Sequence, residues 1–231
     1  MVYTRLVIKV SGHLLSSRDH VLNYSKFLEY AECIKELLDK GHKVVSVVGG
    51  GRLAREFLTI ARSANVGESI RDLIGIHVTR LNALLLASLL YPAAPLRVPS
   101  SLEELLELFE RSKAVCMGGL QPGQSTTAVS ALCAEAIKAD LLLITTDVEG
   151  IYDKDPKKFP DARLKKKISI NRLEDILKET EMLAGTYKLF DKVSLAILKR
   201  SKIPVRVIKG DKEIILGSVE GKPHGSEIIY E

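Results

Sequence analysis

Short apolar segments alternate with longer amphipathic ones through the first two thirds of the chain, and this alternation limits the fold more than any other feature of the sequence. Residues 6–10 and 141–145 are almost wholly apolar, which is typical of strands buried on both faces. In residues 27–38 the apolar side chains recur at three- and four-residue steps, as in an amphipathic helix. Strands and helices in this order form parallel sheets with crossover helices. The sequence therefore predicts an α/β fold with a mainly parallel central sheet.

The expected elements follow from apolar spacing and from the residues that end each segment. Residues 147–167 change to a composition of Gly, Pro, Asp and Lys, which marks either a surface excursion or the start of a second lobe. A capping box in residues 100–104 is expected to start a helix that ends at residue 111. The expected strands are residues 6–10, 43–48, 96–98, 114–117, 141–145 and 204–208, followed by two short β-like segments. The other expected helices are residues 27–38, 53–63, 70–90, 126–139, 171–179 and 193–200.

Size and charge narrow the class of protein. A chain of 231 residues with 46% hydrophobic residues can bury a substantial core, which excludes disordered, collagen-like and disulfide-scaffold classes. The net charge of +5 suits a polyanion or a phosphorylated small molecule equally well. Only 5% of the residues are aromatic and Trp is absent, so the chain lacks the stacking side chains of single-stranded nucleic-acid binders. We therefore expect small phosphates, and no nucleic acid, as ligands.

The cysteines and the apolar segments indicate the cellular compartment in which the protein is expected. Cys33, Cys116 and Cys133 are widely spaced in apolar surroundings, which predicts buried free thiols in a reducing compartment. No basic region precedes a long apolar segment at the N-terminus, so no signal peptide is expected. The longest apolar stretch, residues 83–91, is far shorter than the roughly 20 residues that a membrane span needs. A cytoplasmic protein that binds no membrane is expected.

Three expected strands end in glycine-containing turns that precede helices. The turns contain Gly12, the three glycines at 49–51, and the pair at 118–119. Glycine lets the backbone approach an anion closely, and the amides at a helix N-terminus supply fixed donors. On one edge of a parallel sheet such turns form a phosphate-binding crevice, to which Lys9 would add positive charge. Taken singly, each turn could equally well serve only to connect a strand to a helix.

Better-known motifs are missing from the sequence. Residues 49–51 lack the G-x-G-x-x-G spacing of dinucleotide-binding folds, and the chain contains no P-loop, no G-x-S-x-G elbow and no H-E-x-x-H helix. The histidines share no metal-ligand spacing, so we expect surface or packing roles for them and no metal ion held by the chain's own side chains. The five histidines are His13, His20, His42, His77 and His224.

A polar segment at residues 145–156 follows an apolar strand and turns at Gly150. It presents Tyr152, carboxylates and Pro156, against which a ring or a ribose could lie while Thr and backbone groups bond it. The same composition is also typical of a long hydrophilic turn with no ligand.

Taken together, the motifs resemble the amino acid kinase superfamily, and within it the archaeal uridylate (UMP) kinases most closely. The resemblance covers essentially the whole chain and rests on several motifs in the same order. They are the Lys9–Gly12 segment, Gly-Gly-Gly-Arg-Leu-Ala-Arg at 49–55, Asp-Leu-Ile-Gly-Ile at 72–76 with Thr-Arg-Leu-Asn-Ala at 79–83, Gly-Gly-Leu-Gln-Pro-Gly-Gln-Ser-Thr at 118–126, Thr-Asp-Val-Glu-Gly-Ile-Tyr at 146–152, and Ala-Gly-Thr-Tyr at 184–187 with Ser-Lys-Ile at 201–203.

The resemblance implies a three-layer αβα sandwich that forms one domain over residues 1–231. About residues 1–139 would form the lobe for the phosphoryl acceptor, and about residues 140–231 the lobe for ATP. It further implies ATP- and Mg²⁺-dependent phosphorylation of UMP to UDP, and a homohexamer built as a trimer of dimers.

Site residues are carried over by the same resemblance. Lys9, Gly12 and Gly50 would act on the transferring phosphoryl group. Arg55 would pair with the UMP phosphate, Asp72 would bond the ribose, and Ser125 and Thr126 would read the uracil. The full UMP set is Gly50, Gly51, Arg55, Asp72, Gly75, Thr79, Ser125 and Thr126. The ATP set is Lys9, Ser11, Gly12, Thr146, Asp147, Gly150, Tyr152, Asp155 and Pro156.

Some positions depart from the pattern of these relatives. His13 stands where Lys or Ser is common, Asp147 where archaeal relatives usually have Asn, and Thr127 where many members carry Asp. Asp191 favours a nucleotide over a carboxylate acceptor, and the neighbouring Lys192 weakens that preference. Two alternatives therefore stay open: a kinase of this fold that acts on another small phosphate or a carboxylate, and a nucleotide-binding storage or regulatory protein.

The positive charge is concentrated in one segment. Residues 153–167 contain seven Lys and Arg against three Asp, a surplus of four out of the chain's +5. This segment directly follows the expected ATP-binding motif. It either steers the triphosphate or forms an ordinary solvated face.

Overall fold

A seven-stranded sheet forms the centre of the molecule in the computed structural model, which describes residues 4–17, 20–181 and 189–230. The strand order is β3-β2-β1-β4-β6-β7-β5, and every neighbouring pair is parallel except the antiparallel pair β6–β7. The expectation of a mainly parallel sheet is confirmed. The strands are β1 (Arg5–Val10), β2 (Lys43–Val48), β3 (Ala114–Met117), β4 (Leu141–Thr146), β5 (Lys167–Ser169), β6 (Val205–Lys209) and β7 (Ser226–Ile229).

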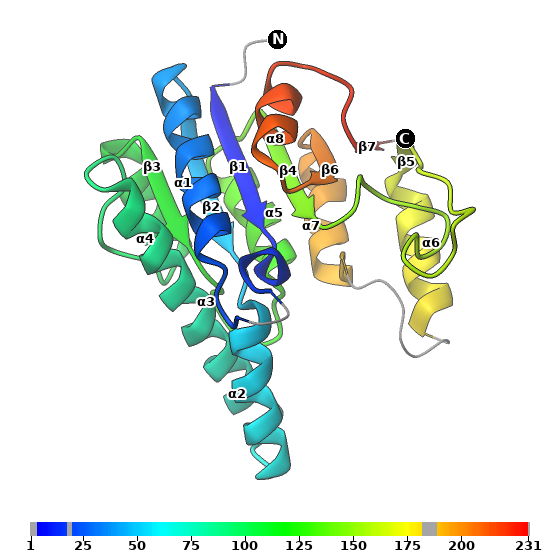
Figure 1. Ribbon diagram of the computed structural model, residues 1–231, viewed down its shortest axis with the longest axis horizontal. Helices are drawn as coiled ribbons and strands as arrows, with labels where there is room; N and C mark the ends of the chain where they lie inside the picture. Colours follow the sequence, from blue (N-terminus) through cyan, green and yellow to red (C-terminus); the bar gives the residue numbers. More distant parts are fainter. Residues whose placement is uncertain (1–3, 18–19, 182–188, 231) are drawn as a thin grey trace.

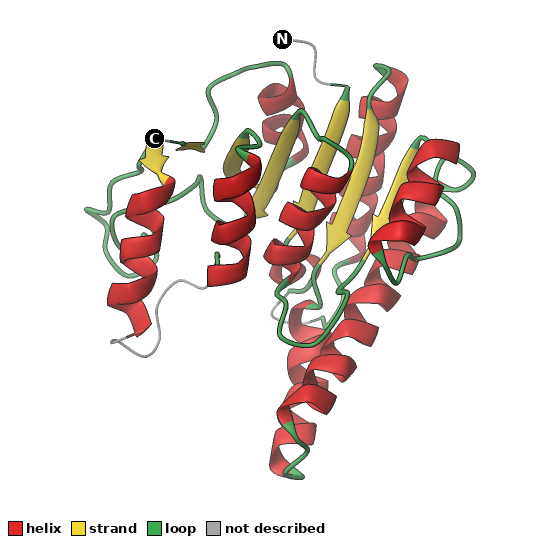
Figure 2. Cartoon of the chain, turned by 180° about the vertical axis from the view of Figure 1, so that it is seen from behind, coloured by secondary structure: helices red, strands yellow, loops and turns green. Residues whose placement is uncertain are grey.

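Helices cover both faces of this sheet, so the expected three-layer αβα architecture is confirmed (Figures 1 and 2). The helices α1, α3 and α8 pack on one face, and α4, α5 and α7 pack on the other. The bounds are η1 (Gly12–Leu15, a 3₁₀ turn), α1 (Tyr24–Asp39), α2 (Gly51–Ser63), α3 (Glu68–Leu90), α4 (Leu102–Arg111), α5 (Thr126–Ala136), α6 (Ile170–Glu181), α7 (Lys192–Ser201) and α8 (Lys212–Val219).

The strand β1 shows why the two layers form. Leu6 and Ile8 pack toward α1 and α3, whereas Val7 packs toward α5, because successive side chains of a strand point to opposite faces. All three side chains are fully buried. The three cysteines lie in these cores as buried free thiols, as expected from their apolar surroundings. Burial raises the pKa of Cys33 and of Cys116 to about 12, so these thiols are unreactive at neutral pH.

The strand order places a switch in topology between β1 and β4. From β1 the chain moves through β2 to β3 on one side, and it then returns to start β4 on the other side of β1. In open parallel sheets, ligands bind outside the carboxyl ends of the strands at such a switch. The crevice is therefore expected where the turns after β1 and β4 lie side by side.

The helices α2 and α3 pack against each other and project from the sheet as a long hairpin (Figure 1). By length and composition α3 is apolar enough to cross a membrane, although its uninterrupted apolar run is short. Part of that apolar surface is used within the fold, because Ala83, Leu86 and Leu90 are buried against the sheet and α1. Other apolar side chains of α3, such as Leu81, remain exposed.

Three expected elements differ from the structure. Residues 96–98 form no strand, because they lie between Pro95 and Pro99 and have no partner strand. The first of the two expected β-like segments after β6 is the helix α8, whose Ile215 and Val219 lie one helical turn apart and are buried against the α1 layer. The helix α5 ends at Ala136 rather than residue 139. The described fold also contains β5, which lies at the end of the polar segment 147–167.

Candidate active site

The glycine turns after β1 and β2 are in direct backbone contact at the edge of the sheet. A Cβ atom on Gly12 would lie 2.1 Å from the Gly51 nitrogen, and one on Gly51 would lie 2.3 Å from the Gly12 oxygen. Gly51 also has a φ of +63°, a conformation that favours glycine. Only glycine lets these turns approach so closely, and their amides lie together at the start of α2. The arrangement is typical of a phosphate cradle.

The third turn, after β3, is held by α3. The Thr79 hydroxyl accepts a hydrogen bond from the Gly119 N–H at 2.7 Å, and the Arg80 guanidinium donates to the Gly119 and Leu120 carbonyl oxygens. Asn82 donates from Nδ2 to the Gly49 carbonyl oxygen at 2.9 Å. Arg80 and Asn82 therefore position two glycine turns. The sequence does not predict either as a site residue, although both lie in the 79–83 motif.

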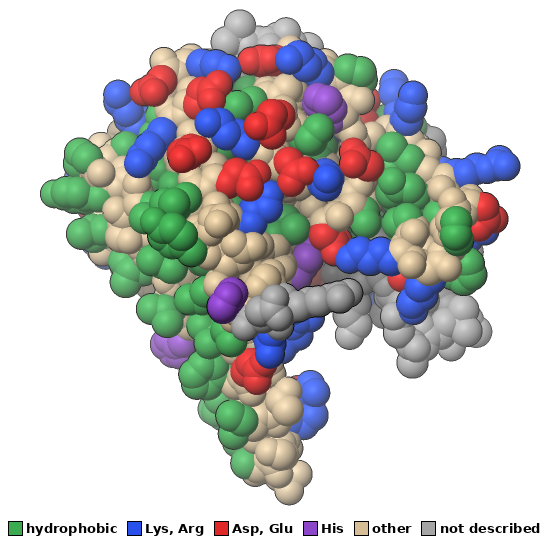
Figure 3. Space-filling view, viewed as in Figure 1, with side chains coloured by type: hydrophobic (Ala, Val, Ile, Leu, Met, Phe, Trp, Pro, Cys, Tyr) green, Lys and Arg blue, Asp and Glu red, His purple; other side chains and the backbone are tan. Residues whose placement is uncertain are grey.

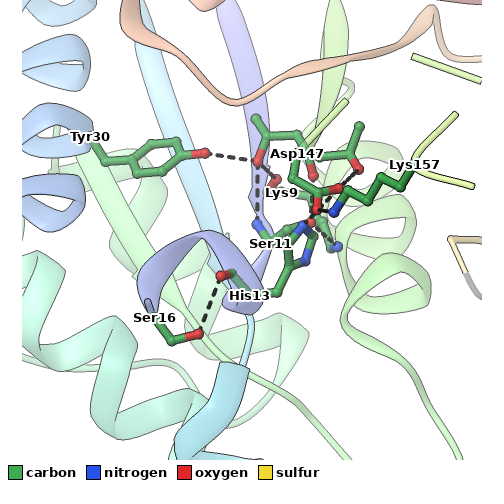
Figure 4. Close-up of polar contacts among 9 residues, drawn as sticks. Lys9, Ser11, His13, Ser16, Tyr30, Asp147 and Lys157 are labelled. Carbon is green, nitrogen blue, oxygen red and sulfur yellow. Dashed lines mark hydrogen bonds and ion pairs between the residues drawn. The ribbon is translucent and has the colours of Figure 1, made fainter. Parts of the chain in front are cut away.

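Lys9 lies at the end of the central strand β1, between Val47 of β2 and Ile144 of β4. The residue is 8% exposed, and its ammonium donates to the Ser11 hydroxyl at 2.6 Å (Figure 4). Among the described residues this is its one side-chain hydrogen bond, so two N–H groups remain for a ligand. Burial lowers the pKa of Lys9 to about 8. Lys9 is still mostly protonated at pH 7 and is poorly neutralised by its surroundings.

A hydrogen-bond network ties the turn after β1 to the end of β4. The Ser11 hydroxyl donates to the Thr145 carbonyl oxygen, and the Thr145 hydroxyl donates to the Lys9 carbonyl oxygen at 2.9 Å. The Tyr30 hydroxyl donates to Thr145 Oγ1 at 3.0 Å from the α1 layer (Figure 4). Thr145 and Tyr30 are therefore positioning residues. A buried hydroxyl in a wholly apolar strand signals Thr145, whereas nothing in the sequence signals Tyr30.

A second polar cluster bridges the same two strand ends. His13 Nε2 lies 3.3 Å from Asp147 Oδ1, and Lys157 forms an ion pair with the same carboxylate (Figure 4). Partial burial acts to raise the pKa of Asp147, but the Lys157 hydrogen bond and the charge of His13 hold it below its ordinary value. Burial lowers the pKa of His13. The negative charge of Asp147 acts to raise this pKa, and the positive charge of Lys9 acts to lower it further. His13 is thus a partly exposed residue with a carboxylate partner.

A cavity of about 190 Å³ opens beside the glycine turns, between α2, α3 and the loop before α5. Asp72 lines it and holds the loop before α5, because the Gly123 N–H donates to Asp72 Oδ2 at 2.9 Å. The wall includes six of the eight residues expected to bind UMP, which are Gly50, Gly51, Asp72, Gly75, Thr79 and Thr126. The wall also contains Arg71, Gln121 and Gln124, which were not expected from the sequence.

The other two residues expected to bind UMP lie outside this wall. Arg55 is exposed on α2. Ser125 is the N-cap of α5: its hydroxyl accepts from the Ala128 N–H at 3.1 Å and donates to the Asp191 carboxylate. Asp191 in turn caps α7. The Ser125 side chain is therefore used to join two helix N-termini.

The residues expected to surround ATP come from β4 and the loop that follows it. Thr146 is buried at the strand end. Gly150 allows close contact with β7, because a Cβ there would lie 2.6 Å from the Ser226 hydroxyl, which also accepts from the Ile151 N–H. Tyr152 and Leu164 form an isolated antiparallel β-bridge. The Asp155 carboxylate, next to Pro156, accepts a hydrogen bond from the Lys157 N–H at 3.0 Å. The loop is thus a defined turn anchored on β7.

Comparison with known proteins agrees with this geometry. The profile of the amino acid kinase family matches residues 4–209. The chain belongs to the amino acid kinase family. Within this family, the uridylate kinase of Metallosphaera sedula is 44% identical over 209 residues, which are 90% of this chain and 91% of that protein. The uridylate kinase of Sulfurisphaera tokodaii is 41% identical over 226 residues, 97% of this chain and 98% of that protein.

Solved structures of this kinase family share the fold. The crystal structure of uridylate kinase from Archaeoglobus fulgidus superposes with a TM-score of 0.85 at 38% identity, covering 97% of this chain and 99% of that one. The UMP kinase from Bacillus anthracis has a TM-score of 0.81 at 21% identity over 99% of this chain and 96% of that one, and thus shares the architecture.

The positions that depart from the family pattern have structural partners. Thr127 is buried and donates to the Leu189 carbonyl oxygen at 2.8 Å, so it anchors the segment before α7. Lys192 is exposed at the first turn of α7, next to Asp191. The motif at 184–187 lies outside the described residues.

In the part of the chain that the structure describes, no three His, Cys, Asp or Glu side chains converge to hold a metal ion.

Proposed function

We propose that this amino acid kinase transfers the γ-phosphoryl group of ATP to UMP and so produces UDP and ADP, a step of pyrimidine nucleotide biosynthesis. The observation that carries the proposal is the backbone contact between the Gly12 and Gly51 turns, with the Lys9 ammonium buried beside them. Fixed amides and a buried cation stabilise the charge of a phosphoryl group in transfer. Identity to uridylate kinases over nearly the whole chain supports UMP as the acceptor.

In this proposal the acceptor occupies the cavity beside α2 and α3. Its phosphate lies against the Gly50 and Gly51 amides, and an oxygen of that phosphate forms a bond to the γ-phosphorus of ATP. The bond from that phosphorus to the bridging oxygen breaks, and the electron pair leaves with ADP. Lys9 and the Gly12 amide hold the transferring group in line, so positioning and charge neutralisation carry the catalysis. Asp72 bonds the ribose, and Arg55, which is exposed on α2 outside the cavity wall, would pair with the acceptor phosphate only by turning its side chain toward the Gly50 and Gly51 turns.

ATP lies in the other half of the site, over β4 and the loop that follows. Ser11 and Gly12 hold its phosphates, and Thr146, Tyr152, Asp155 and Pro156 surround its base and ribose. Asp147 and Gly150 belong to the same ATP-binding loop. The chain offers no cage for a cation among its described residues. Mg²⁺ would be held mainly by the ATP phosphates, with Asp147 as the carboxylate of the site, and would neutralise part of their charge. Residues 1–139 and 140–231 are the corresponding acceptor and ATP lobes of one cytoplasmic enzyme.

The substrate is tested with a panel of acceptors in the presence of ATP and Mg²⁺, by following ADP release. We expect kcat/KM to be highest for UMP among UMP, CMP, AMP and GMP. Isopentenyl phosphate and an amino-acid carboxylate represent the other acceptors open to this fold. A preference for one of them would contradict the acceptor assignment, and ATP binding without ADP release would favour a storage or regulatory protein.

We also propose that the α2–α3 hairpin binds a second copy of the chain, in an assembly that reaches a hexamer. Figure 3 shows hydrophobic side chains continuing along this hairpin. The exposed large hydrophobic residues of α2 and α3 include Phe57 at 50% exposure, Ile60 at 68% and Leu81 at 58%. A monomer seldom exposes so continuous an apolar face.

The assembly is tested by Leu81→Glu, which places a charge on this face. We expect the purified protein to have the mass of a hexamer by light scattering, and the variant to have a smaller mass at the same concentration. Lys35→Glu on the exposed side of α1 is the control and should leave the mass unchanged. A monomeric wild-type protein would exclude the assembly.

A further inference from the structure

The Asp147 carboxylate bridges two sides of the proposed ATP site. Its Oδ1 atom lies 3.3 Å from His13 Nε2, and its Oδ2 atom accepts a hydrogen bond from the Lys157 ammonium. Figure 4 shows these three side chains meeting from three segments, which are the turn after β1, the end of β4 and the loop that follows it. Both carboxylate oxygens are therefore engaged by partners from segments that line the proposed site.

Positive groups gather on this side of the turn after β1. Besides its contact with Asp147, His13 lies near enough to the Lys9 ammonium for that charge to lower its pKa. Two other carboxylates of the loop, those of Asp153 and Asp155, accept hydrogen bonds from backbone N–H groups of the loop itself. Asp147, in contrast, faces the phosphate-binding turn through His13.

The contacts of Asp147 can be exchanged for others without loss of the fold. The side chain of Lys157 is 62% exposed, and those of His13 and Asp147 are also partly exposed. Exposed ion pairs contribute little to stability, because water screens the charges and the long side chains must be ordered. A triphosphate bound at the turn would therefore compete with Asp147 for the same two partners.

The charge of the nucleotide decides whether Asp147 keeps a partner in this competition. If phosphate oxygens take over His13 and Lys157, the carboxylate is left beside the negative charge of the nucleotide and repels it. Mg²⁺-bound ATP carries less negative charge than metal-free ATP, and carboxylate oxygens are suitable ligands for the ion it brings. With the Mg²⁺ complex each charged group keeps an opposite partner, whereas with metal-free ATP the carboxylate does not.

We propose that Asp147 is a specificity residue that makes the site select Mg²⁺-bound ATP over metal-free ATP. The inference rests on the proposed function and assigns the choice between two forms of the same donor to one side chain. His13 and Lys157 hold the carboxylate toward the turn until the nucleotide replaces it as their partner. A neutral side chain at this position would leave both partners available to either form of ATP.

The test measures ATP affinity without an acceptor, so that it needs no turnover. Isothermal titration calorimetry gives Kd for ATP with excess Mg²⁺ and with EDTA, in the wild-type protein and in Asp147→Asn. Asparagine keeps the shape of the side chain and removes its charge. We expect the wild-type protein to bind the Mg²⁺ complex more tightly. Asp147→Asn should gain affinity for metal-free ATP, so that the ratio of the two Kd values changes by about 5-fold or more.

Two further variants and a change of salt complete the test. Asp161→Asn removes the carboxylate of another ion pair in the same loop, that with Lys154, and should leave the Kd ratio unchanged. Lys157→Met removes a partner that compensates Asp147, so it should weaken metal-free ATP more than the Mg²⁺ complex. At about 1 M salt, where charges are screened beyond about 3 Å, the difference between Asp147→Asn and the wild-type protein should shrink.

An unchanged Kd ratio in Asp147→Asn would overturn the inference. Equal changes in both Kd values would also overturn it, because a purely structural role of Asp147 affects both forms of ATP alike. The same holds if Lys157→Met shifts the ratio in the direction of Asp147→Asn. Failure of the proposed function gives a different result, which is ATP binding with no ADP release when UMP is added. A wild-type protein that binds neither form of ATP would overturn both.

Discussion

Replacing Lys9 with methionine should reduce kcat/KM by at least about 10²-fold, the usual size of the effect when one fixed charge contact to a transition state is lost. Methionine keeps the unbranched stem that packs in the core and removes only the ammonium. Steady-state kinetics with UMP and ATP measure the loss. Near-normal turnover would contradict the role of Lys9.

The same variant should be more stable than the wild-type protein near pH 7. Burial lowers the pKa of Lys9 from 10.5 to about 8. Between these two values the unfolded chain binds more protons than the folded one, so this group's contribution to stability rises with pH across that window. Below pH 8 Lys9 is protonated in both states, so burial of its charge destabilises the folded state by the full amount. Lys9→Met should therefore raise the free energy of unfolding by on the order of 1–3 kcal/mol at pH 7, which thermal or denaturant unfolding measures.

The lowered pKa also predicts the alkaline side of the pH profile. In the wild-type protein, kcat/KM for ATP reports groups of the free enzyme, so it should fall as pH rises through about 8, where Lys9 loses its proton. In Lys9→Met, kcat/KM for ATP should be low at every pH and should not fall near pH 8. An alkaline limb that persists in Lys9→Met would assign the titration to another group.

Gly12→Ala should have the second large effect, because the added carbon would overlap the turn after β2. It would lie 2.1 Å from the Gly51 nitrogen and 2.8 Å from the Gly50 nitrogen. Both neighbours are backbone atoms, so the two turns must separate. A displacement of about 1 Å can reduce turnover by about 10²-fold, and we expect at least that loss. The free energy of unfolding should fall by on the order of 2–4 kcal/mol.

Gly67→Ala is the matched control for this substitution. A Cβ on Gly67, at the start of α3, has no atom within 4 Å. Its kinetics and its unfolding midpoint should remain close to those of the wild-type protein. If Gly12→Ala behaved in the same way, close contact between the turns would not be required for phosphoryl transfer.

Most of the fold could be predicted from local patterns. The strands β2 and β3 have the bounds expected from apolar runs, and α1 ends before Gly41, whose φ of +88° suits a residue just past a helix. These features are local because β2 and β3 are buried on both faces and α1 on one. The segment that became α8 is β-branched, and its helical state depends on packing against the α1 layer. Local propensity could not reveal that packing.

The site was predictable to the extent that its chemistry lies in glycine turns. Gly12, Gly50 and Gly51 stand out because only glycine permits their approach, and Lys9 stands out as a charge in an apolar strand. The partners of Thr145 and Ser125 were not predictable. Tyr30 reaches Thr145 from another layer, and Asp191 reaches Ser125 across 66 residues of sequence.

The sequence by itself determined the α/β class, the turns that meet at the sheet edge, and the family to which the chain belongs, because these depend on residue type and short-range spacing. The tertiary structure alone decided which side chains enter the acceptor cavity. Arg55 and Arg71 carry the same charge on neighbouring helices, yet Arg71 lines the cavity and Arg55 is exposed. The difference depends on how α2 and α3 pack and on the loop that Asp72 holds, which are long-range contacts that no local pattern records.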